Sequence, residues 1–292
     1  MENMFKGVGV ALVTPFNSDK SIDFKGLKRL VQLQIEGGTD YLVVQGTTGE
    51  SPVLSLEEKK QILQTVIDEN NGKLKIVYGL GGNNTMAVGE LFKQIPSGVD
   101  GILSVSPFYN KPTQKGIIDH FKYLASCTRL PIILYNVPGR TSSNMAVETI
   151  LELAKINNIV AIKEASGNIE QITDLLRLRP EGFGIISGDD PITYPMITMG
   201  ADGVISVVAN ALPELFNDMV HLAMKGDLNN ALQIHFDLIQ VTKYFFQEGN
   251  PSGVKEALKL RGVCEKNLRL PLVEVSSELS GKIKSEVTRL TN

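Results

Sequence analysis

A repeated alternation of short β-branched runs and longer amphipathic stretches constrains the fold of this chain most strongly. Each run is followed by turn residues and then by a stretch with helical periodicity. The eight runs are residues 8–13, 41–44, 75–78, 101–105, 131–135, 159–163, 183–187 and 203–207. Nearly continuous apolar runs that alternate with helices are typical of parallel strands buried beneath helices. Eight such units in series predict an α/β protein with a closed (β/α)8 barrel, the TIM-barrel architecture.

The stretches between these runs carry the signals of amphipathic helices. Residues 23–36 repeat apolar side chains at helical spacing. Residues 55–70 open with Ser55 and Glu58, which fit a capping box. Further helices are expected at residues 85–95, 113–127, 146–156, 169–178, 192–199 and 214–224.

Beyond residue 226 the strand pattern ends. Residues 228–246, 254–263 and 277–290 have helical periodicity and are separated by proline and glycine. We therefore expect a barrel that carries the active site over residues 1–226, followed by a C-terminal three-helix extension over residues 227–292.

A doubly wound open sheet is the competing architecture. It rarely needs eight evenly spaced parallel strands, and its dinucleotide-binding fingerprint fails in this chain. The nearest match, residues 79–84, reads Gly-Leu-Gly-Gly-Asn-Asn and has asparagine where the third glycine belongs. The barrel is therefore the favoured prediction.

Composition excludes several classes of function. The 292 residues are 42% hydrophobic and 21% charged, with a formal net charge of −3, as is ordinary for a globular protein. No cluster of Lys and Arg stands out, so nucleic acid is not an expected partner. The longest apolar runs are too short to span a bilayer, and the N-terminus lacks a signal peptide, so no membrane association is expected.

Cysteine and histidine usage points to a reduced, metal-free protein. Cys127 and Cys264 lie far apart, which suits a cytoplasmic protein better than a disulfide framework. The histidines at 120, 221 and 235 have no metal-ligand spacing, so no metal site is expected.

Lys163 is the strongest single candidate for chemistry, because active sites of barrels lie at the C-terminal ends of the strands. Side chains alternate along a strand, so Ala161 and Lys163 share one face while Val160 and Ile162 share the other. If Val160 and Ile162 pack on helices, Lys163 points into the barrel, where a desolvated amine becomes a nucleophile towards carbonyl groups. The alternative is a lysine that reaches solvent or pairs with Glu164.

Other strand ends carry polar groups that suit a small carboxylated substrate. Tyr135 can carry protons or simply cap the barrel mouth. Thr47 and Thr48, between glycines, can bind a carboxylate or form a plain polar turn. Arg140 can bind a carboxylate in bidentate fashion or lie solvated in its loop. Asp190, followed by proline, is expected to cap a helix.

Seven segments, in this order and at this spacing, resemble the dihydrodipicolinate synthase family of class I aldolase-like pyruvate lyases. The resemblance runs from about residue 5 to residue 280. The matching segments are 13–16, 46–51 (Gly-Thr-Thr-Gly-Glu-Ser), 106–112, 135–141 (Tyr-Asn-Val-Pro-Gly-Arg-Thr), 162–167 (Ile-Lys-Glu-Ala-Ser-Gly), 187–190 and 203–206.

The resemblance implies a condensation of pyruvate with L-aspartate 4-semialdehyde in lysine (diaminopimelate) biosynthesis. Lys163 would form an imine with pyruvate, so that no metal or organic cofactor is needed. Tyr135 would donate and accept protons, with Thr47 and Tyr109 completing the relay.

The resemblance also implies how the substrates are bound. Thr48 would hold the pyruvate carboxylate, with main-chain contacts from Gly188 and Ile205. Arg140 would bind the carboxylate of aspartate semialdehyde. Tyr109 would reach into the neighbouring subunit, which implies a homo-oligomer, commonly a tetramer built as a dimer of dimers.

Rival functions remain on the sequence alone. N-acetylneuraminate lyases and 2-keto-3-deoxy sugar-acid aldolases share the lysine, tyrosine and threonine motifs, but Arg140 favours a short carboxylated aldehyde. A phosphate-binding barrel isomerase would need glycine-rich loops after the seventh and eighth strands. A non-catalytic sensor would not need Lys163, Tyr135 and Thr47 together.

The chain departs from the family at two places. In residues 250–255 (Asn-Pro-Ser-Gly-Val-Lys), Gly253 replaces the usual second proline at a position expected to be remote from the chemistry. At the expected lysine-inhibition site, Asn83 and Ser51 match. The other positions do not, and they carry Leu56, Lys59, Ala87 and Phe108. Weak or absent inhibition by lysine is therefore expected.

Overall fold

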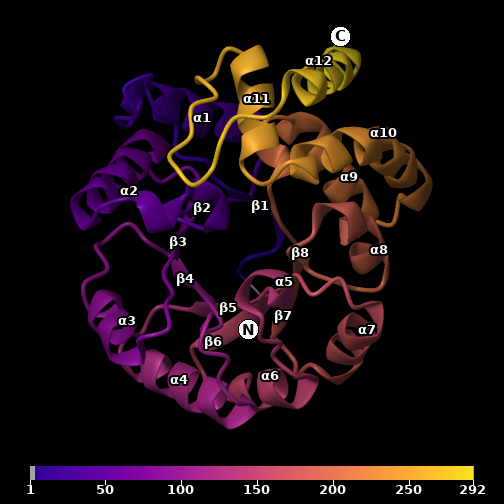
Figure 1. Ribbon diagram of the computed structural model, residues 1–292. Coiled ribbons are helices and arrows are strands. Elements are labelled where there is room, and N and C mark those ends of the chain that lie inside the picture. The colour runs from indigo at the N-terminus through magenta and orange to yellow at the C-terminus, as the bar shows by residue number, and fades with distance from the viewer. Residues whose placement is uncertain (1–3, 292) are drawn as a thin grey trace.

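Eight parallel strands form a closed barrel in the computed structural model, which describes residues 4–291. The strands follow one another around the ring in chain order, and β8 pairs with β1 to close it (Figure 1). The strands are β1 Gly7–Ala11, β2 Tyr41–Val44, β3 Lys75–Gly79, β4 Gly101–Val105, β5 Ile132–Asn136, β6 Ile159–Glu164, β7 Gly184–Ser187 and β8 Gly203–Ser206. The predicted TIM barrel is confirmed.

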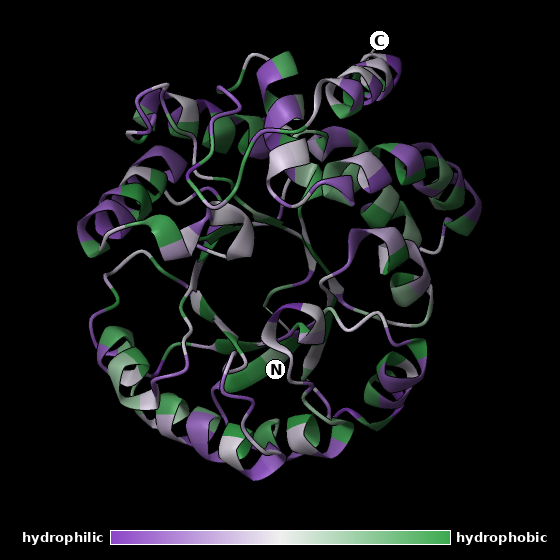
Figure 2. Ribbon diagram, viewed as in Figure 1, coloured by the Kyte–Doolittle hydropathy of each residue, from purple (hydrophilic) through white to green (hydrophobic). Residues whose placement is uncertain are grey.

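Helices surround the barrel and continue beyond it. They are α1 Phe24–Glu36, α2 Leu56–Asn70, α3 Thr85–Phe92, α4 Gln114–Ser126, α5 Pro138–Thr141, α6 Val147–Leu153, α7 Ile169–Leu178, α8 Thr193–Thr198, α9 Pro213–Met224, α10 Leu228–Gln247, α11 Ser252–Leu260 and α12 Ser277–Thr291. Short 3-10 helices follow three strands: η1 Thr47–Gly49, η2 Ser51–Val53, η3 Asp190–Ile192 and η4 Val208–Asn210. Figure 2 shows apolar faces on the barrel side of many helices and polar faces outside.

Local signals explain where several helices begin. Ser55 accepts a hydrogen bond from the backbone of Glu58, and the Glu58 side chain accepts one from the backbone of Ser55, so the predicted capping box at α2 is present. The short α5 and the 3-10 helices were not predicted, because elements of three or four residues carry too little periodicity to be seen in the sequence.

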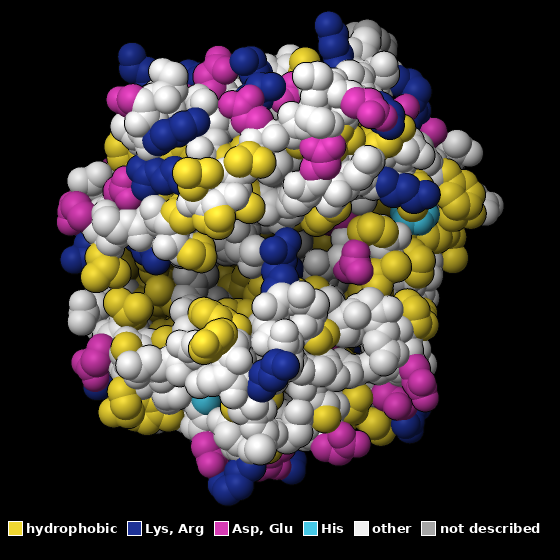
Figure 3. Space-filling view, viewed as in Figure 1, with side chains coloured by type: hydrophobic (Ala, Val, Ile, Leu, Met, Phe, Trp, Pro, Cys, Tyr) yellow, Lys and Arg dark blue, Asp and Glu magenta, His cyan; other side chains and the backbone are white. Residues whose placement is uncertain are grey.

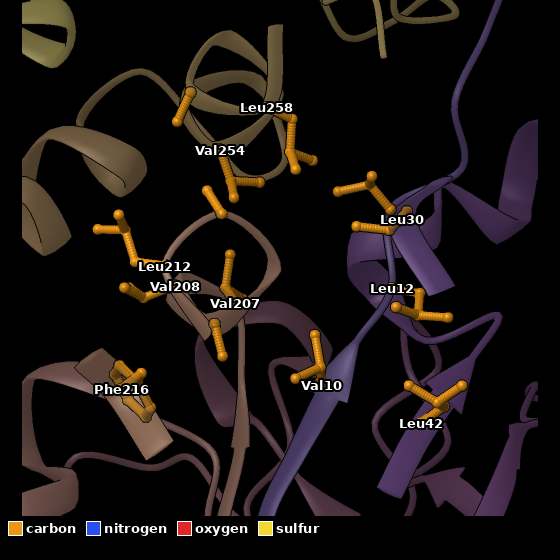
Figure 4. Close-up of a cluster of buried hydrophobic side chains, with 14 of the residues drawn as sticks. Val10, Leu12, Leu30, Leu42, Val207, Val208, Leu212, Phe216, Val254 and Leu258 are labelled. Atoms are coloured by element: carbon orange, nitrogen blue, oxygen red, sulfur yellow. The ribbon is translucent and has the colours of Figure 1, made fainter. Parts of the chain in front are cut away.

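The core is divided among three clusters of buried apolar side chains. One fills the barrel, one lies between the barrel and α3, α4, α6 and α7, and the largest runs from β1 and β2 through α1 and α9 to α10, α11 and α12. Figure 4 shows part of the largest cluster, in which Val254 and Leu258 of α11 approach Val207 and Val208 at the end of β8. The C-terminal helices therefore share a core with the barrel. A domain boundary at residue 226 stays a prediction.

A bulge in β6 determines which way its side chains point. Ile132 pairs with Ile159, but the next residue of β5 pairs with Ala161, so Val160 is left over. Ile159 and Ile162 pack towards the helices, whereas Val160 and Ala161 both pack against the cluster inside the barrel. Of the two residues whose packing on helices was the condition for an inward Lys163, Val160 does not meet it, because the bulge inserts one residue into the alternation. Ile162 does face the helices, as expected.

Among residues 4–291, every helix is too short or too polar to cross a lipid bilayer.

Candidate active site

Lys163 lies inside the barrel mouth at the end of β6. Its side chain is only 5% exposed, and it is in register with Tyr135 on β5. The Nζ atom lies 4.5 Å from the centroid of the Tyr135 ring. Within residues 4–291 the ammonium makes no ion pair or hydrogen bond. A buried amine beside an aromatic ring, and without a carboxylate partner, is suited to act as a nucleophile.

Glu164 does not pair with Lys163, so that alternative is wrong. Its carboxylate is fully buried on the other side of β6 and accepts hydrogen bonds from Asn136 Nδ2 (3.0 Å), Ser166 N (2.7 Å) and Gln171 Nε2 (3.1 Å). These donors satisfy the charge. They also connect β5, β6 and α7 immediately behind Lys163, which fixes the end of the strand.

Six of the eight predicted site residues meet around two adjoining cavities at the C-terminal ends of the strands. A small cavity of about 170 Å³ is lined by Thr47, Thr48, Tyr135, Arg140, Lys163 and Gly188, among others. A larger cavity of about 530 Å³ shares Thr47, Tyr135 and Arg140 with it and extends towards Phe108 and Arg269. In Figure 1, α5 crosses this mouth, and Figure 3 shows a hollow there with hydrophobic side chains inside.

Gly188 makes room for Lys163. A Cβ at this position would lie 2.9 Å from Cε of Lys163 and 2.7 Å from Cβ of Ala165. The N–H of Gly188 already donates to the Glu164 carbonyl (2.8 Å), so only its own carbonyl is free for a substrate. The predicted Ile205 lies on β8 with its side chain buried in the barrel interior, and it lines neither cavity.

Thr48 is held by a residue that the sequence analysis did not single out. It lies buried in η1, and its Oγ1 accepts a hydrogen bond from Nδ2 of Asn250 (3.0 Å). Asn250 follows α10 and lines both cavities. Of the segment 250–255, only Asn250 lines the cavities, and the Gly253 position lies away from them, as expected. In the sequence, Asn250 was noticed only as the first residue of the segment 250–255 that was compared with the family.

Arg140 and Tyr109 lie at the rim. Arg140 projects from α5 and lines both cavities, and its guanidinium has no hydrogen-bond or ion-pair partner within the described residues. Tyr109 is 87% exposed, has a φ of +75° and lines neither cavity. Within this chain the Tyr109 side chain therefore stands apart from the cavities around Lys163.

Two carboxyl groups border the base of the site. Burial raises the pKa of Asp189, although the charge of Lys163 opposes the shift. Burial also raises the pKa of Asp190 to about 6. The expectation that Asp190 caps a helix is wrong. Its Oδ2 instead accepts hydrogen bonds from the backbone of Val207 (2.9 Å) and Val208 (3.0 Å), which holds the turn after β8.

Comparison with known proteins places the chain in a family. The profile of the Dihydrodipicolinate synthetase family matches residues 4–290. The chain belongs to this family. The expected membership of the dihydrodipicolinate synthase family is thereby confirmed.

Individual members of the family match over nearly their full length. A 4-hydroxy-tetrahydrodipicolinate synthase of Parabacteroides distasonis is 49% identical, over 98% of this chain and 97% of its own. One of Flavobacterium psychrophilum is 50% identical, over 96% of each chain. The crystal structure of dihydrodipicolinate synthase from Aquifex aeolicus superposes with a TM-score of 0.94 at 40% identity, covering 98% of both chains. This similarity to named relatives confirms the expected lyase activity, that of a 4-hydroxy-tetrahydrodipicolinate synthase.

Proposed function

We propose that Lys163 forms an imine with pyruvate in the small cavity. The observation that carries this proposal is the buried, unpaired ammonium beside the Tyr135 ring. Attack of the amine on the pyruvate carbonyl expels water and leaves a protonated imine. The imine withdraws electrons, so the pyruvate methyl group loses a proton and becomes an enamine nucleophile.

Tyr135 carries protons in this scheme, because its side chain lines both cavities and contacts Lys163. Thr47 lines the same cavities and extends the relay. Thr48 donates its hydroxyl proton to the pyruvate carboxylate, since its oxygen already accepts from Asn250. Gly188 lines the small cavity beside Lys163 and leaves room for pyruvate there, and a main-chain contact from Ile205 completes the proposed pyruvate site.

Arg140 binds the carboxylate of L-aspartate 4-semialdehyde. Its partnerless guanidinium at the rim of both cavities supports this assignment. The enamine carbon then bonds to the aldehyde carbon, whose oxygen becomes a hydroxyl group. The amine of the second substrate attacks the imine carbon and expels Lys163, which closes the ring and frees the enzyme. Each step uses only side chains and substrates, so we propose that neither metal nor organic cofactor takes part.

The enzyme acts as a homo-oligomer in this proposal, as a dimer of dimers. Tyr109 is exposed in one chain and would complete the proton relay of its neighbour. A relative with 38% identity is described as a monomeric variant. We place the enzyme in the cytoplasm, where its two free cysteines would stay reduced.

Trapping of the imine tests the central step. Borohydride added with pyruvate should increase the mass of the peptide that contains Lys163, and Lys163→Ala should abolish the increase. Lys115→Ala is the control, because that side chain is 83% exposed and remote from the cavities. No mass increase at Lys163 in the wild type would refute the mechanism.

Kinetics with the second substrate test the role of Arg140. Arg140→Ala should lower kcat/KM for aspartate semialdehyde about 10²–10³-fold while imine formation survives. Arg177→Ala, a change at an exposed arginine on α7, should leave both unchanged. Efficient cleavage of N-acetylneuraminate by the wild type would favour the rival lyase.

Mixed assemblies test the role of Tyr109. Tyr109→Phe subunits and Lys163→Ala subunits should each have little activity alone. Mixed dimers should regain part of it, because one of their two sites then receives both intact residues. Proven mixing without rescue would show that Tyr109 acts within its own subunit.

A further inference from the structure

Asp189 brings a carboxylate to the small cavity that contains Lys163. It follows β7 and lines this cavity together with Lys163, Tyr135 and Arg140. Within the described residues, these four are the ionisable members of the small-cavity wall. The single acidic group on the wall is therefore that of Asp189.

The turn around Asp189 does not use this carboxylate. Its position before η3 suits a helix cap, but the side chain makes no cap hydrogen bond. The backbone holds the turn instead, because the Asp189 carbonyl accepts from Oγ1 of Thr193 (3.1 Å) and its N–H donates to Oγ of Ser187 (3.3 Å). Among residues 4–291 neither carboxylate oxygen has a hydrogen-bond partner. Neither is among the buried polar atoms without a partner, so both keep accessible surface.

The fold keeps the Asp189 carboxylate near Lys163 without joining the two in an ion pair. Strands β6 and β7 pair in register as far as Glu164 and Ser187. The next residue, Gly188, packs against the Lys163 side chain, and Asp189 follows it directly. The charges of Asp189 and Lys163 act on each other. Because no ion pair joins them within residues 4–291, the Lys163 amine stays free to attack pyruvate.

The step after imine formation needs a negative charge at this place. In the protonated imine the C=N electron pair can move onto Nζ of Lys163. The methyl C–H bond then breaks, its proton passes to the Tyr135 relay and a neutral enamine forms. An imine that has lost its proton withdraws electrons far less. A nearby carboxylate favours the protonated form, because opposite charges stabilise each other.

The other titratable groups around the imine nitrogen contribute less or oppose this effect. Arg140 is positive and disfavours a second cation in the same cavity. Tyr135 presents the face of its ring. Asp190 and Glu164 line neither cavity, and their carboxylates already accept hydrogen bonds from other groups. The free carboxylate of Asp189 is therefore the best placed counter-charge.

We propose that the Asp189 carboxylate keeps the imine of Lys163 and pyruvate protonated and so promotes enamine formation. This inference rests on the proposed function of Lys163. Asp189 touches no reacting atom and acts through Lys163, so it is a positioning residue. Its charge also favours the ammonium over the free amine of Lys163, so its benefit comes after the attack on pyruvate and not before it.

Exchange of the pyruvate methyl protons for deuterium in D2O measures enamine formation without the second substrate. Proton NMR follows this exchange as a function of pH. We expect its alkaline limb to lie about one pH unit lower in Asp189→Asn than in the wild type. On that limb the variant should then exchange about 10-fold more slowly. At the acid end, where both imines stay protonated, the two rates should agree within about 3-fold.

Two further variants serve as controls. Asp189→Glu keeps the charge and should return the alkaline limb towards its wild-type position. Asp119→Asn removes a carboxylate that is exposed on α4 and paired with Lys115, so it should leave the profile unchanged. Borohydride trapping with pyruvate at the acid end should succeed in every variant.

An equal loss of exchange at every pH in Asp189→Asn would indicate a structural role and overturn the inference, and so would an unshifted profile. Unchanged exchange with a lower kcat/KM for aspartate semialdehyde would also overturn it, because Asp189 would then act on the second substrate. If the wild type forms no imine, the proposed function itself has failed. If the imine forms but the limb does not move, only the role of Asp189 is refuted.

Discussion

The ammonium group of Lys255 on α11 lies 2.5 Å from Oε1 of Glu50, and both side chains are almost completely buried. Lys255 also donates to the carbonyl of Asn267 (2.8 Å) and lies over the ring of Phe16. The second oxygen of Glu50 accepts from the backbone of Arg269 (3.1 Å). Because Glu50 directly follows η1, the C-terminal part of the chain anchors the loop that carries Thr47 and Thr48.

Replacement of Lys255 should therefore destabilise the folded protein. Lys255→Met leaves the Glu50 carboxylate buried without its counter-ion, and we expect the free energy of unfolding to fall by about 3–5 kcal/mol. The double variant with Glu50→Gln should recover part of that loss. Urea unfolding measures both. Lys259→Met on the same helix is the control, because its ion pair with Glu265 is exposed and contributes about 1 kcal/mol at most.

Gly253 has a steric reason to be glycine. A Cβ there would lie 2.6 Å from the Cα and carbonyl oxygen of Phe245, where backbone cannot yield as a flexible side chain would. We expect Gly253→Ala to destabilise the protein by about 1–3 kcal/mol. Gly281→Ala in α12 should instead stabilise it by about 0.5–1 kcal/mol, because a Cβ there contacts nothing. Equal shifts in Tm for both variants would contradict this packing argument.

Acid should weaken the fold through His120. Burial lowers the pKa of His120 to about 4, and its Nδ1 lies 2.8 Å from Oγ1 of Thr85. Below pH 6.5 the unfolded chain takes up the proton first, so stability is complete above pH 6.5 and falls towards pH 4, by about 3 kcal/mol in total. His120→Gln should flatten this loss in urea titrations at pH 7 and pH 5.

His221 provides the opposite case. A hydrogen bond to Asp40 raises the pKa of His221. Its contribution to stability is therefore present below pH 6.5 and is lost as the pH rises through the raised pKa. His221→Gln should cost more at pH 5 than at pH 8. The same pH trend for both histidine variants would refute these assignments.

Lysine should not inhibit the enzyme at millimolar concentration. Lys59 lines the larger cavity beside Ser51 and Phe108, and Ala87 is exposed outside it. The ammonium group of an incoming lysine molecule would meet the like charge of Lys59. At position 87 it would find an alanine and not a carboxylate. A relative from Cyanidioschyzon merolae, 35% identical, is described with lysine bound. Initial rates and calorimetry with lysine test this prediction. Half-inhibition below about 1 mM, or a binding free energy more favourable than about −4 kcal/mol, would contradict it.

Sequence periodicity was sufficient to predict the eight strands and the end of the barrel at which the candidate active site lies. Parallel strands with helices between them leave few topologies, so residues at strand ends such as Lys163 and Tyr135 could be placed together. Periodicity did not reveal the bulge at Val160, because a bulge is a property of strand pairing and not of one strand's composition.

Long-range contacts explain what else was missed. Asn250 lies 202 positions from Thr48 along the chain, and the sequence around either residue does not predict their hydrogen bond. Asp190 had the local pattern of a cap, yet one oxygen of its carboxylate accepts hydrogen bonds from backbone 17 and 18 residues later. Tertiary contacts outweighed local preference at both places.

The bulge at Val160 also lets β6 lose one residue without moving Lys163. Helix-facing and barrel-facing positions alternate along a strand. The extra residue Val160 interrupts this alternation, so that Ile159 and Ile162 both face the helices. Deleting Val160 would restore regular alternation and leave Lys163 opposite Tyr135 and inside the mouth, because Ala161, Ile162 and Lys163 already alternate regularly. The direction of the Lys163 side chain is therefore set by the regular pairing of residues 161–163 with β5, and not by the bulge before them.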